Sequence, residues 1–222
     1  EKKIAYINSL LKVGFDTIDF GSFVSPKAVP QMADTAEVVR GLDPGAGTTK
    51  LLAIIANQRG AEAASVFDQI NYLGFPFSVS ETFQQRNTNS SIAQSLERVE
   101  EIQDLCVKTG KKLVVYISMG FGNPYGDQYD EEIVFERVNE LVAMDIGIIS
   151  LADTVGVATP AQVYEMTSYL IESLPGIEIG VHLHSTPQNW KEKLEAAIGA
   201  GCKRFDGALK GIGGCPMADD EL

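Results

Sequence analysis

Short, largely apolar runs alternate along the chain with segments whose apolar residues recur every three or four positions. Short apolar runs are typical of strands buried on both faces, whereas the three-to-four repeat is typical of amphipathic helices. The pattern predicts strands over residues 17–21, 50–56, 72–80, 112–118, 147–152, 177–184 and 204–209. It predicts helices over residues 1–13, 33–41, 60–67, 91–108, 130–144, 159–173 and 187–200.

Local signals support the starts of two of these helices. Ser91 and Gln94 have the spacing of a capping box, and Thr159 is followed by Pro160, a proline at the first helical position. Strands and helices alternate without a linker or a change of composition. The sequence therefore predicts a parallel sheet of βα units in one domain that covers residues 1–222.

Two α/β folds fit this alternation, a doubly wound open sheet and a (β/α)8 TIM barrel. The barrel is favoured because the strands are short, the units repeat evenly, and polar clusters follow strand after strand. An eight-stranded barrel would have its first strand before Glu1 and its final helix after Leu222. We therefore expect a barrel with both ends missing from this sequence.

Composition narrows the classes of partner. A net charge of −12 argues against nucleic acid and against an anionic membrane surface. No apolar run approaches the roughly 20 residues that span a bilayer, and residues 1–11 are too charged for a signal peptide. The three cysteines have no paired spacing, which suits a reducing compartment. We expect a soluble protein of the cytoplasm, or of an organelle matrix if the source is eukaryotic.

The chain has two histidines, His182 and His184, at the end of the predicted strand 177–184. Because side chains alternate across a strand, the two imidazoles point to the same face. Such a pair is half of a divalent-metal site. The alternative is a hydrogen-bonded core histidine beside a loop histidine, and the spacing alone leaves both open.

In a barrel, the ends of the strands form one rim, which carries the active site. Polar residues lie at or just after the ends of the predicted strands, at Asp19, Ser22, Asn57, Glu81, Ser118, Asp153, Thr154, His182 and His184. After the last strand, the segment 210–216 places three glycines before Cys215. This cysteine is placed like a reactive acid or nucleophile, or it is a small residue in a glycine-rich turn. The other two cysteines, Cys106 and Cys202, lie on or beside predicted helices, where a role in packing explains their presence.

Several segments together resemble the hydroxymethylglutaryl-CoA lyase family, in the same order and nearly end to end. They are SFVSPK at 22–27, VPQM at 29–32, SLADTVG at 150–156, VHLH at 181–184 and GIGGCP at 211–216. The HxH and Asp-Thr-x-Gly segments are shared with a wider superfamily of metal-dependent barrel lyases and acyl-CoA synthases. The first and last segments are more specific to the lyase.

The resemblance implies cleavage of 3-hydroxy-3-methylglutaryl-CoA to acetyl-CoA and acetoacetate, as in leucine degradation. It implies that His182 and His184 bind Mg²⁺ or Mn²⁺, which polarises the substrate hydroxyl. Cys215 would then supply a proton to the acetyl-CoA enolate. The resemblance also implies an acyl-CoA partner and a homodimer.

Further roles follow from the same resemblance. Asp153 would support the metal site and substrate, and Asp19 stands where many members have a catalytic glutamate. Asn87 matches a position that contacts CoA, and Ser22 is also expected to bind the cofactor. From the residues alone, Asn87 is a loop residue before a helix that Ser90 or Ser91 caps.

The sequence also departs from the family pattern. The Arg-Asp-Gly segment of the first strand and an asparagine ligand beyond the cysteine loop have no match here. Ser185 follows the HxH where an aspartate is common, and Lys210 stands where a small residue is usual. The two histidines therefore account for only part of a metal's coordination.

Alternatives stay open at this point. An acyl-CoA condensing synthase or a hydroxy-oxo-acid aldolase would keep the barrel and the HxH without needing the cysteine. A lyase for a longer 3-hydroxyacyl-CoA would use the same chemistry. A non-catalytic barrel without its first strand would expose two strand edges, which is a severe liability.

Overall fold

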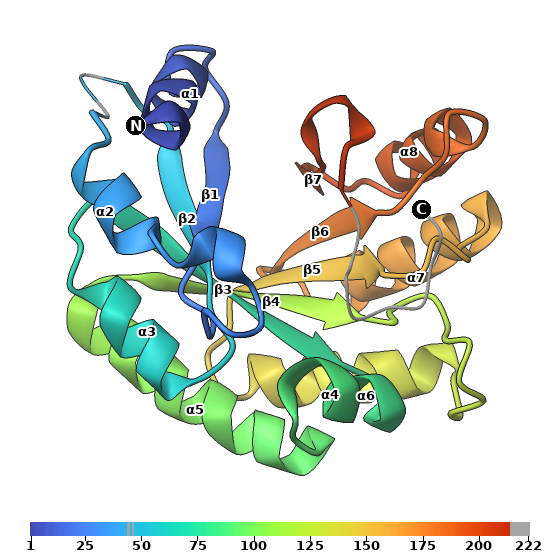
Figure 1. Cartoon of the computed structure of the whole chain (residues 1–222). Helices are drawn as coiled ribbons and strands as arrows, with labels where there is room; N and C mark the ends of the chain where they lie inside the picture. Colours follow the sequence, from blue (N-terminus) through green and yellow to red (C-terminus); the bar gives the residue numbers. More distant parts are fainter. Residues whose placement is uncertain (44, 46, 214–222) are drawn as a thin grey trace. The chain divides into compact units, whose positions relative to one another are not determined.

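The computed structural model describes residues 1–43, 45 and 47–213, and its strands form a parallel sheet in chain order (Figure 1). The described strands number seven, as the hydrophobic pattern predicts. They are β1 (Thr17–Ser22), β2 (Lys50–Ile54), β3 (Ile70–Ser78), β4 (Lys112–Ser118), β5 (Ile148–Asp153), β6 (Glu178–Leu183) and β7 (Arg204–Asp206).

Helices separate the strands. The α-helices are α1 (Lys2–Leu10), α2 (Thr35–Arg40), α3 (Gln58–Ser65), α4 (Glu81–Thr88), α5 (Ile92–Thr109), α6 (Glu131–Val142), α7 (Pro160–Ser173) and α8 (Trp190–Gly199). Short 3₁₀ helices cover η1 (Pro30–Met32) and η2 (Leu209–Gly211). The strand–helix alternation and the parallel pairing are those of the predicted βα units.

Side chains cap the helices at the predicted positions. Thr159 and Gln162 form a complete capping box at the start of α7, and Ser91 and Gln94 form one before α5. Each box satisfies backbone N–H groups that a helix start leaves without an intrahelical partner. The local sequence therefore sets where these helices begin.

The chain divides into two compact units. The first unit comprises Glu1–Phe75 and Arg98–Leu113. In it, β1 pairs with β2, and a register shift between Asp19 and Gly21 marks a bulge in β1. Asp19 aligns with Leu52 and Ser22 with Ile54, so the bulge turns Asp19 and Ser22 to the same face of the sheet.

The second unit comprises Pro76–Glu97 and Val114–Leu222, and it contains β5, β6 and β7 in one uninterrupted register. Every residue of β5 is buried, as the pattern of a strand covered on both faces predicts. Helices α7 and α8 pack on each other and on β6 (Figure 1). This packing holds the end of β6, where the histidines lie.

Element bounds shift by a few residues at several places, and two of the differences from the prediction have a local cause. Residues 81–88 form α4, although they carry no apolar stripe, because Ser80 caps the helix by accepting from the Phe83 N–H and Asp127 accepts from the Thr82 N–H. The last strand is shorter than predicted, since β7 ends at Asp206. Beyond it, Lys210 has a φ of 59°, in the left-handed region, which extended strand backbone does not allow.

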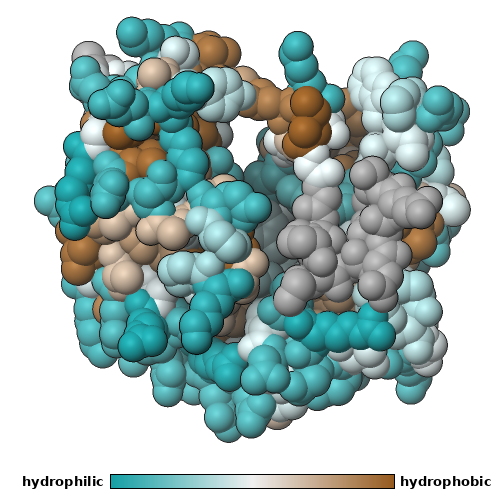
Figure 2. All heavy atoms as spheres, in the orientation of Figure 1, coloured by the Kyte–Doolittle hydropathy of each residue, from teal (hydrophilic) through white to brown (hydrophobic). Residues whose placement is uncertain are grey.

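Hydrophilic residues cover much of the face in Figure 2, with hydrophobic patches between them. This agrees with a chain in which 22% of residues are charged. Within the described part of the chain, no helix is both long and apolar enough to cross a membrane.

The loop after β1 depends on a close approach of backbone to helix α3. A Cβ added to Gly60 would lie 2.5 Å from the Phe23 carbonyl oxygen, whereas one added to Gly199 would meet the Tyr164 ring at an ordinary 3.7 Å. We expect Gly60→Ala to lower the free energy of unfolding by about 1–3 kcal/mol through overpacking. Gly199→Ala should raise it by up to about 1 kcal/mol, because alanine favours helix. Urea denaturation measures both, and equal stability of the two variants would contradict the close approach.

Candidate metal centre and active site

The two histidines lie side by side at the end of β6. Their ring centroids are 5.4 Å apart, and the two residues flank Leu183, so both rings share one face. The Nδ1 atom of each ring is buried and has no hydrogen-bond partner in the described structure. Leaving such an atom unsatisfied costs about 1–3 kcal/mol, a cost that a bound cation or water removes. The pair therefore fits part of a metal's coordination shell.

The surroundings keep His182 in the neutral form that binds metals. Burial lowers the pKa of His182 below its usual value, the neighbouring His184 lowers it further, and Asp206 opposes both. An imidazole with a lowered pKa is uncharged at neutral pH and has a lone pair for a cation. Among the described residues, however, no group of three or more His, Cys, Asp or Glu is placed to hold a metal ion.

Three polar residues of neighbouring strands line the His182 side of the pair. Asp206 of β7 aligns with His182, and its Oδ2 accepts a 2.8 Å hydrogen bond from the Ser150 hydroxyl. The Tyr116 ring meets the His182 ring edge-on, with centroids 5.9 Å apart. Sequence reasoning assigned no role to these residues. The strand register could have indicated them, because alternate residues of adjacent parallel strands face the same side of the sheet.

Asp153, at the end of β5, is enclosed by protein groups. Its side chain is 1% exposed, its Oδ1 accepts from the Ala158 N–H at 3.1 Å, and its Oδ2 accepts from the Lys193 ammonium at 2.6 Å. Lys193 is equally buried, and sequence reasoning missed it. The burial of Lys193 could have been inferred from its position four residues before Ala197, which places both residues on the same, buried face of α8.

Asp19 and Ser22 both lie on β1 in the first unit. The structure brings them to one face of the strand, with Asp19 exposed and Ser22 half-buried. A regular strand would have turned residues three apart to opposite faces, so the bulge is what joins them.

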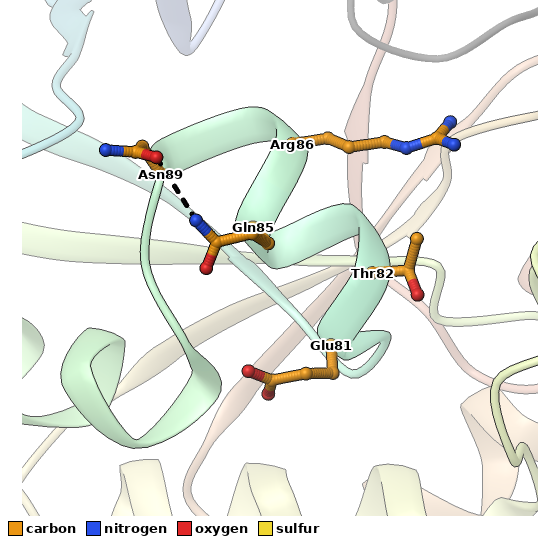
Figure 3. A pocket seen from close by; sticks show the side chains of 5 residues that line it. All are labelled: Glu81, Thr82, Gln85, Arg86 and Asn89. Atoms are coloured by element: carbon orange, nitrogen blue, oxygen red, sulfur yellow. Dashed lines mark hydrogen bonds between the residues drawn. The ribbon is translucent and has the colours of Figure 1, made fainter.

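Asn87 lies inside α4 and is half-buried, so the reading of a loop residue before a helix is wrong. A hollow of about 570 Å³ beside this helix is lined by Glu81, Thr82, Gln85, Arg86 and Asn89 (Figure 3). Gln85 donates a 3.1 Å hydrogen bond to Asn89, and Arg86 extends away from both. The Arg86 guanidinium stacks 4.6 Å over the Tyr125 ring.

Cys215 lies outside the described residues, so its predicted role stays a prediction. The other two thiols are buried and free. Burial raises the pKa of Cys106 to about 12 and raises that of Cys202. Both thiols therefore stay protonated and inert at neutral pH, which agrees with the packing role predicted for them.

Relatives of the chain resemble it over almost its whole length. The hydroxymethylglutaryl-CoA lyase YngG of Bacillus subtilis is 35% identical over 98% of this chain and 72% of its own length. The 3-hydroxy-3-isohexenylglutaryl-CoA/hydroxymethylglutaryl-CoA lyase of Pseudomonas aeruginosa is 35% identical over 97% of this chain and 71% of its own. The mitochondrial lyase of Bos taurus is 34% identical, and the chain spans 66% of its length.

Solved structures support the same relationship. An HMG-CoA lyase of Acinetobacter baumannii, in complex with coenzyme A and 3-methylmalate, matches with a TM-score of 0.91 at 34% identity, covering 98% of this chain and 70% of that one. The carboxyl transferase domain of Rhizobium etli pyruvate carboxylase matches at 0.71 and 18% identity, over 93% of this chain and 36% of that one, which shows the fold alone. The predicted TIM-barrel fold class is thereby confirmed.

The sequence profile described as HMGL-like matches residues 1–216. That match covers both the strand with the histidine pair and the buried Asp153–Lys193 pair. Together with the identities above, it places the chain in a family: the protein belongs to the HMGL-like family, whose relatives named here are hydroxymethylglutaryl-CoA lyases.

Proposed function

We propose that this enzyme is a carbon–carbon lyase that cleaves 3-hydroxy-3-methylglutaryl-CoA to acetyl-CoA and acetoacetate. The observation that carries the proposal is 35% identity to a hydroxymethylglutaryl-CoA lyase over 98% of the chain. A condensing synthase or an aldolase would share the fold and the HxH. The relatives described above are hydroxymethylglutaryl-CoA lyases, which favours the lyase over both.

His182 and His184 are the described residues that would hold a divalent cation, Mg²⁺ or Mn²⁺. Their shared face and buried, unpartnered Nδ1 atoms support this role. When bound, such an ion supplies Lewis-acid polarisation of the substrate's hydroxyl and carboxylate oxygens. Because two imidazoles leave an octahedral shell incomplete, we expect the remaining ligands to be substrate, water and residues beyond those described.

The reaction removes a proton from the C3 hydroxyl and adds one to C2, so it needs a base at one end of the breaking bond and an acid at the other. As the bond between C2 and C3 breaks, its electron pair stays on C2 as the acetyl-CoA enolate, and C3 becomes the ketone of acetoacetate as its hydroxyl loses a proton. Cys215 is proposed to donate the proton that C2 takes up. Asp19 is proposed to act as a catalytic carboxylate, and Ser22, on the same face of β1, is proposed to bind coenzyme A. Asn87 is proposed to contact CoA, and Asp153 to support the site.

One observation supports a second acyl-CoA as substrate. The Pseudomonas aeruginosa relative, whose name includes 3-hydroxy-3-isohexenylglutaryl-CoA, is as similar to this chain as the Bacillus subtilis lyase, at 35% identity. A longer substituent at C3 leaves the bond cleavage unchanged. We therefore propose the branched, longer acyl-CoA as the alternative substrate. The family resemblance further supports a cytoplasmic homodimer that acts in leucine degradation.

The first test is release of acetyl-CoA from each of the two acyl-CoA esters. We expect release from 3-hydroxy-3-methylglutaryl-CoA with Mg²⁺ or Mn²⁺, and its loss when EDTA removes the ion. A higher kcat/KM for the isohexenyl ester would select the alternative substrate. Absence of release from both, by a folded protein that binds Mn²⁺, would sink the lyase proposal and return the condensing enzymes to consideration.

Replacing a proposed ligand should impair both binding and turnover. We expect His182→Ala to weaken Mn²⁺ affinity at least about tenfold and to lower kcat, since one imidazole is lost from the coordination shell. Titration calorimetry with Mn²⁺ and steady-state kinetics measure the two effects. Unchanged affinity in this variant would show that the metal lies elsewhere.

The cysteine variant should separate chemistry from metal binding. We expect Cys215→Ala to lower kcat by about 10²–10⁴-fold, the contribution typical of a positioned proton donor, and to leave Mn²⁺ affinity nearly intact. Cys106→Ala is the matched control, because it removes a buried thiol of α5 to which no role in the reaction is given. Equal turnover of the two variants would overturn the role of Cys215.

A further inference from the structure

Lys193 is a buried cation whose hydrogen-bonding capacity is fully used. Its side chain is 1% exposed, although it lies in helix α8. The ammonium donates to Asp153 Oδ2 at 2.6 Å, to the His184 carbonyl oxygen at 3.0 Å and to the Gly156 carbonyl oxygen at 3.1 Å. An ammonium has three protons, and here each has an acceptor.

These three bonds join separate segments at one point. Asp153 is the last residue of β5, Gly156 lies in the turn after it, and His184 directly follows β6. Asp153 in turn accepts from the Ala158 N–H, which extends the connection towards the start of α7. Helix α8 is thus tied through one side chain to the ends of two adjacent strands.

Stability alone is a poor explanation for such a pair. Removing two charges from water costs several kcal/mol per ion, and apolar side chains of similar volume are often as stabilising. The neighbouring Lys191 shows the ordinary arrangement, 68% exposed with an i,i+4 pair to Glu195. What the buried pair supplies, and an apolar pair could not, is a directed bond to the carbonyl of a histidine in the metal centre.

We propose that Lys193 is a positioning residue for the histidine pair: by holding the His184 carbonyl against Asp153, it fixes the backbone from which the His184 imidazole projects. The inference rests on the proposed metal-binding role of the pair. Without the Lys193 bond, the segment after β6 can rotate, and the two rings no longer converge on one ion. Lys193 itself does not contact the substrate.

The test compares Mn²⁺ affinity and histidine NMR signals among four proteins without a histidine tag. They are the unaltered chain, Lys193→Met, the double variant Asp153→Asn/Lys193→Met, and the control Lys191→Met. The double variant leaves no unpaired buried charge, so it keeps the fold if Lys193→Met alone does not. It still lacks the donor to the His184 carbonyl.

We expect every folded variant without Lys193 to bind Mn²⁺ at least about tenfold more weakly, because its ligands are less well preorganised. Lys191→Met should bind like the unaltered chain. The sequence has two histidines, so ¹⁵N-histidine labelling reports both rings of the metal-free protein directly. In the variants without Lys193, the His184 signals should shift or broaden, while Lys191→Met leaves both rings unchanged.

Wild-type affinity with unchanged ring signals in the double variant would overturn the inference and leave Lys193 a purely structural role. If the unaltered chain binds no Mn²⁺, the proposed metal site fails. The ring signals then still decide whether Lys193 orders His184. The two failures are therefore distinguishable.

Discussion

The parallel register of β5, β6 and β7 is the constraint on which the candidate site depends. Each residue of β6 has a fixed partner on β5, and Gly180–His182 also have partners on β7, so that Ala152 and Asp206 lie beside His182. A slip of one residue would turn both histidines to the other face, away from Asp206 and Ser150. Because β5 is buried throughout and α7 and α8 pack against β6, such a slip would expose core residues.

The polar groups near the two histidines are distributed unequally. The His182 side carries Asp206, Ser150 and Tyr116, whereas the backbone of His184 is bound by a buried lysine. The imidazole Nδ1 atoms receive no hydrogen bond from the described residues, whereas Asp206, Ser150 and the His184 carbonyl each take part in one. A folded protein rarely leaves two adjacent buried nitrogens unsatisfied, and such atoms are commonly ligands. The contrast is the physical basis for the proposed metal centre.

Irregular backbone positions in the first unit place its candidate site residues as much as the regular strands and helices do. The bulge in β1 brings Asp19 and Ser22 to one face, and Gly60 lets helix α3 approach the Phe23 carbonyl. Both devices act on the segment that carries the SFVSPK motif at residues 22–27. Bulges are common beside active sites because the one extra residue redirects a side chain.

The amino-acid sequence by itself determined the order of strands and helices, the helix caps at Ser91 and Thr159, and the shared face of His182 and His184. These properties depend on short-range periodicity and local hydrogen bonds, which any chain carries in its sequence. Only the tertiary structure revealed helix α4, which Asp127 helps to cap from 45 residues away, and the joint face of Asp19 and Ser22. It alone showed that Lys193, which its polarity would place in solvent, is buried against Asp153 and His184. Such contacts join residues that are distant in the chain. They cannot be predicted from the sequence, because tertiary packing determines which charged side chains are removed from water.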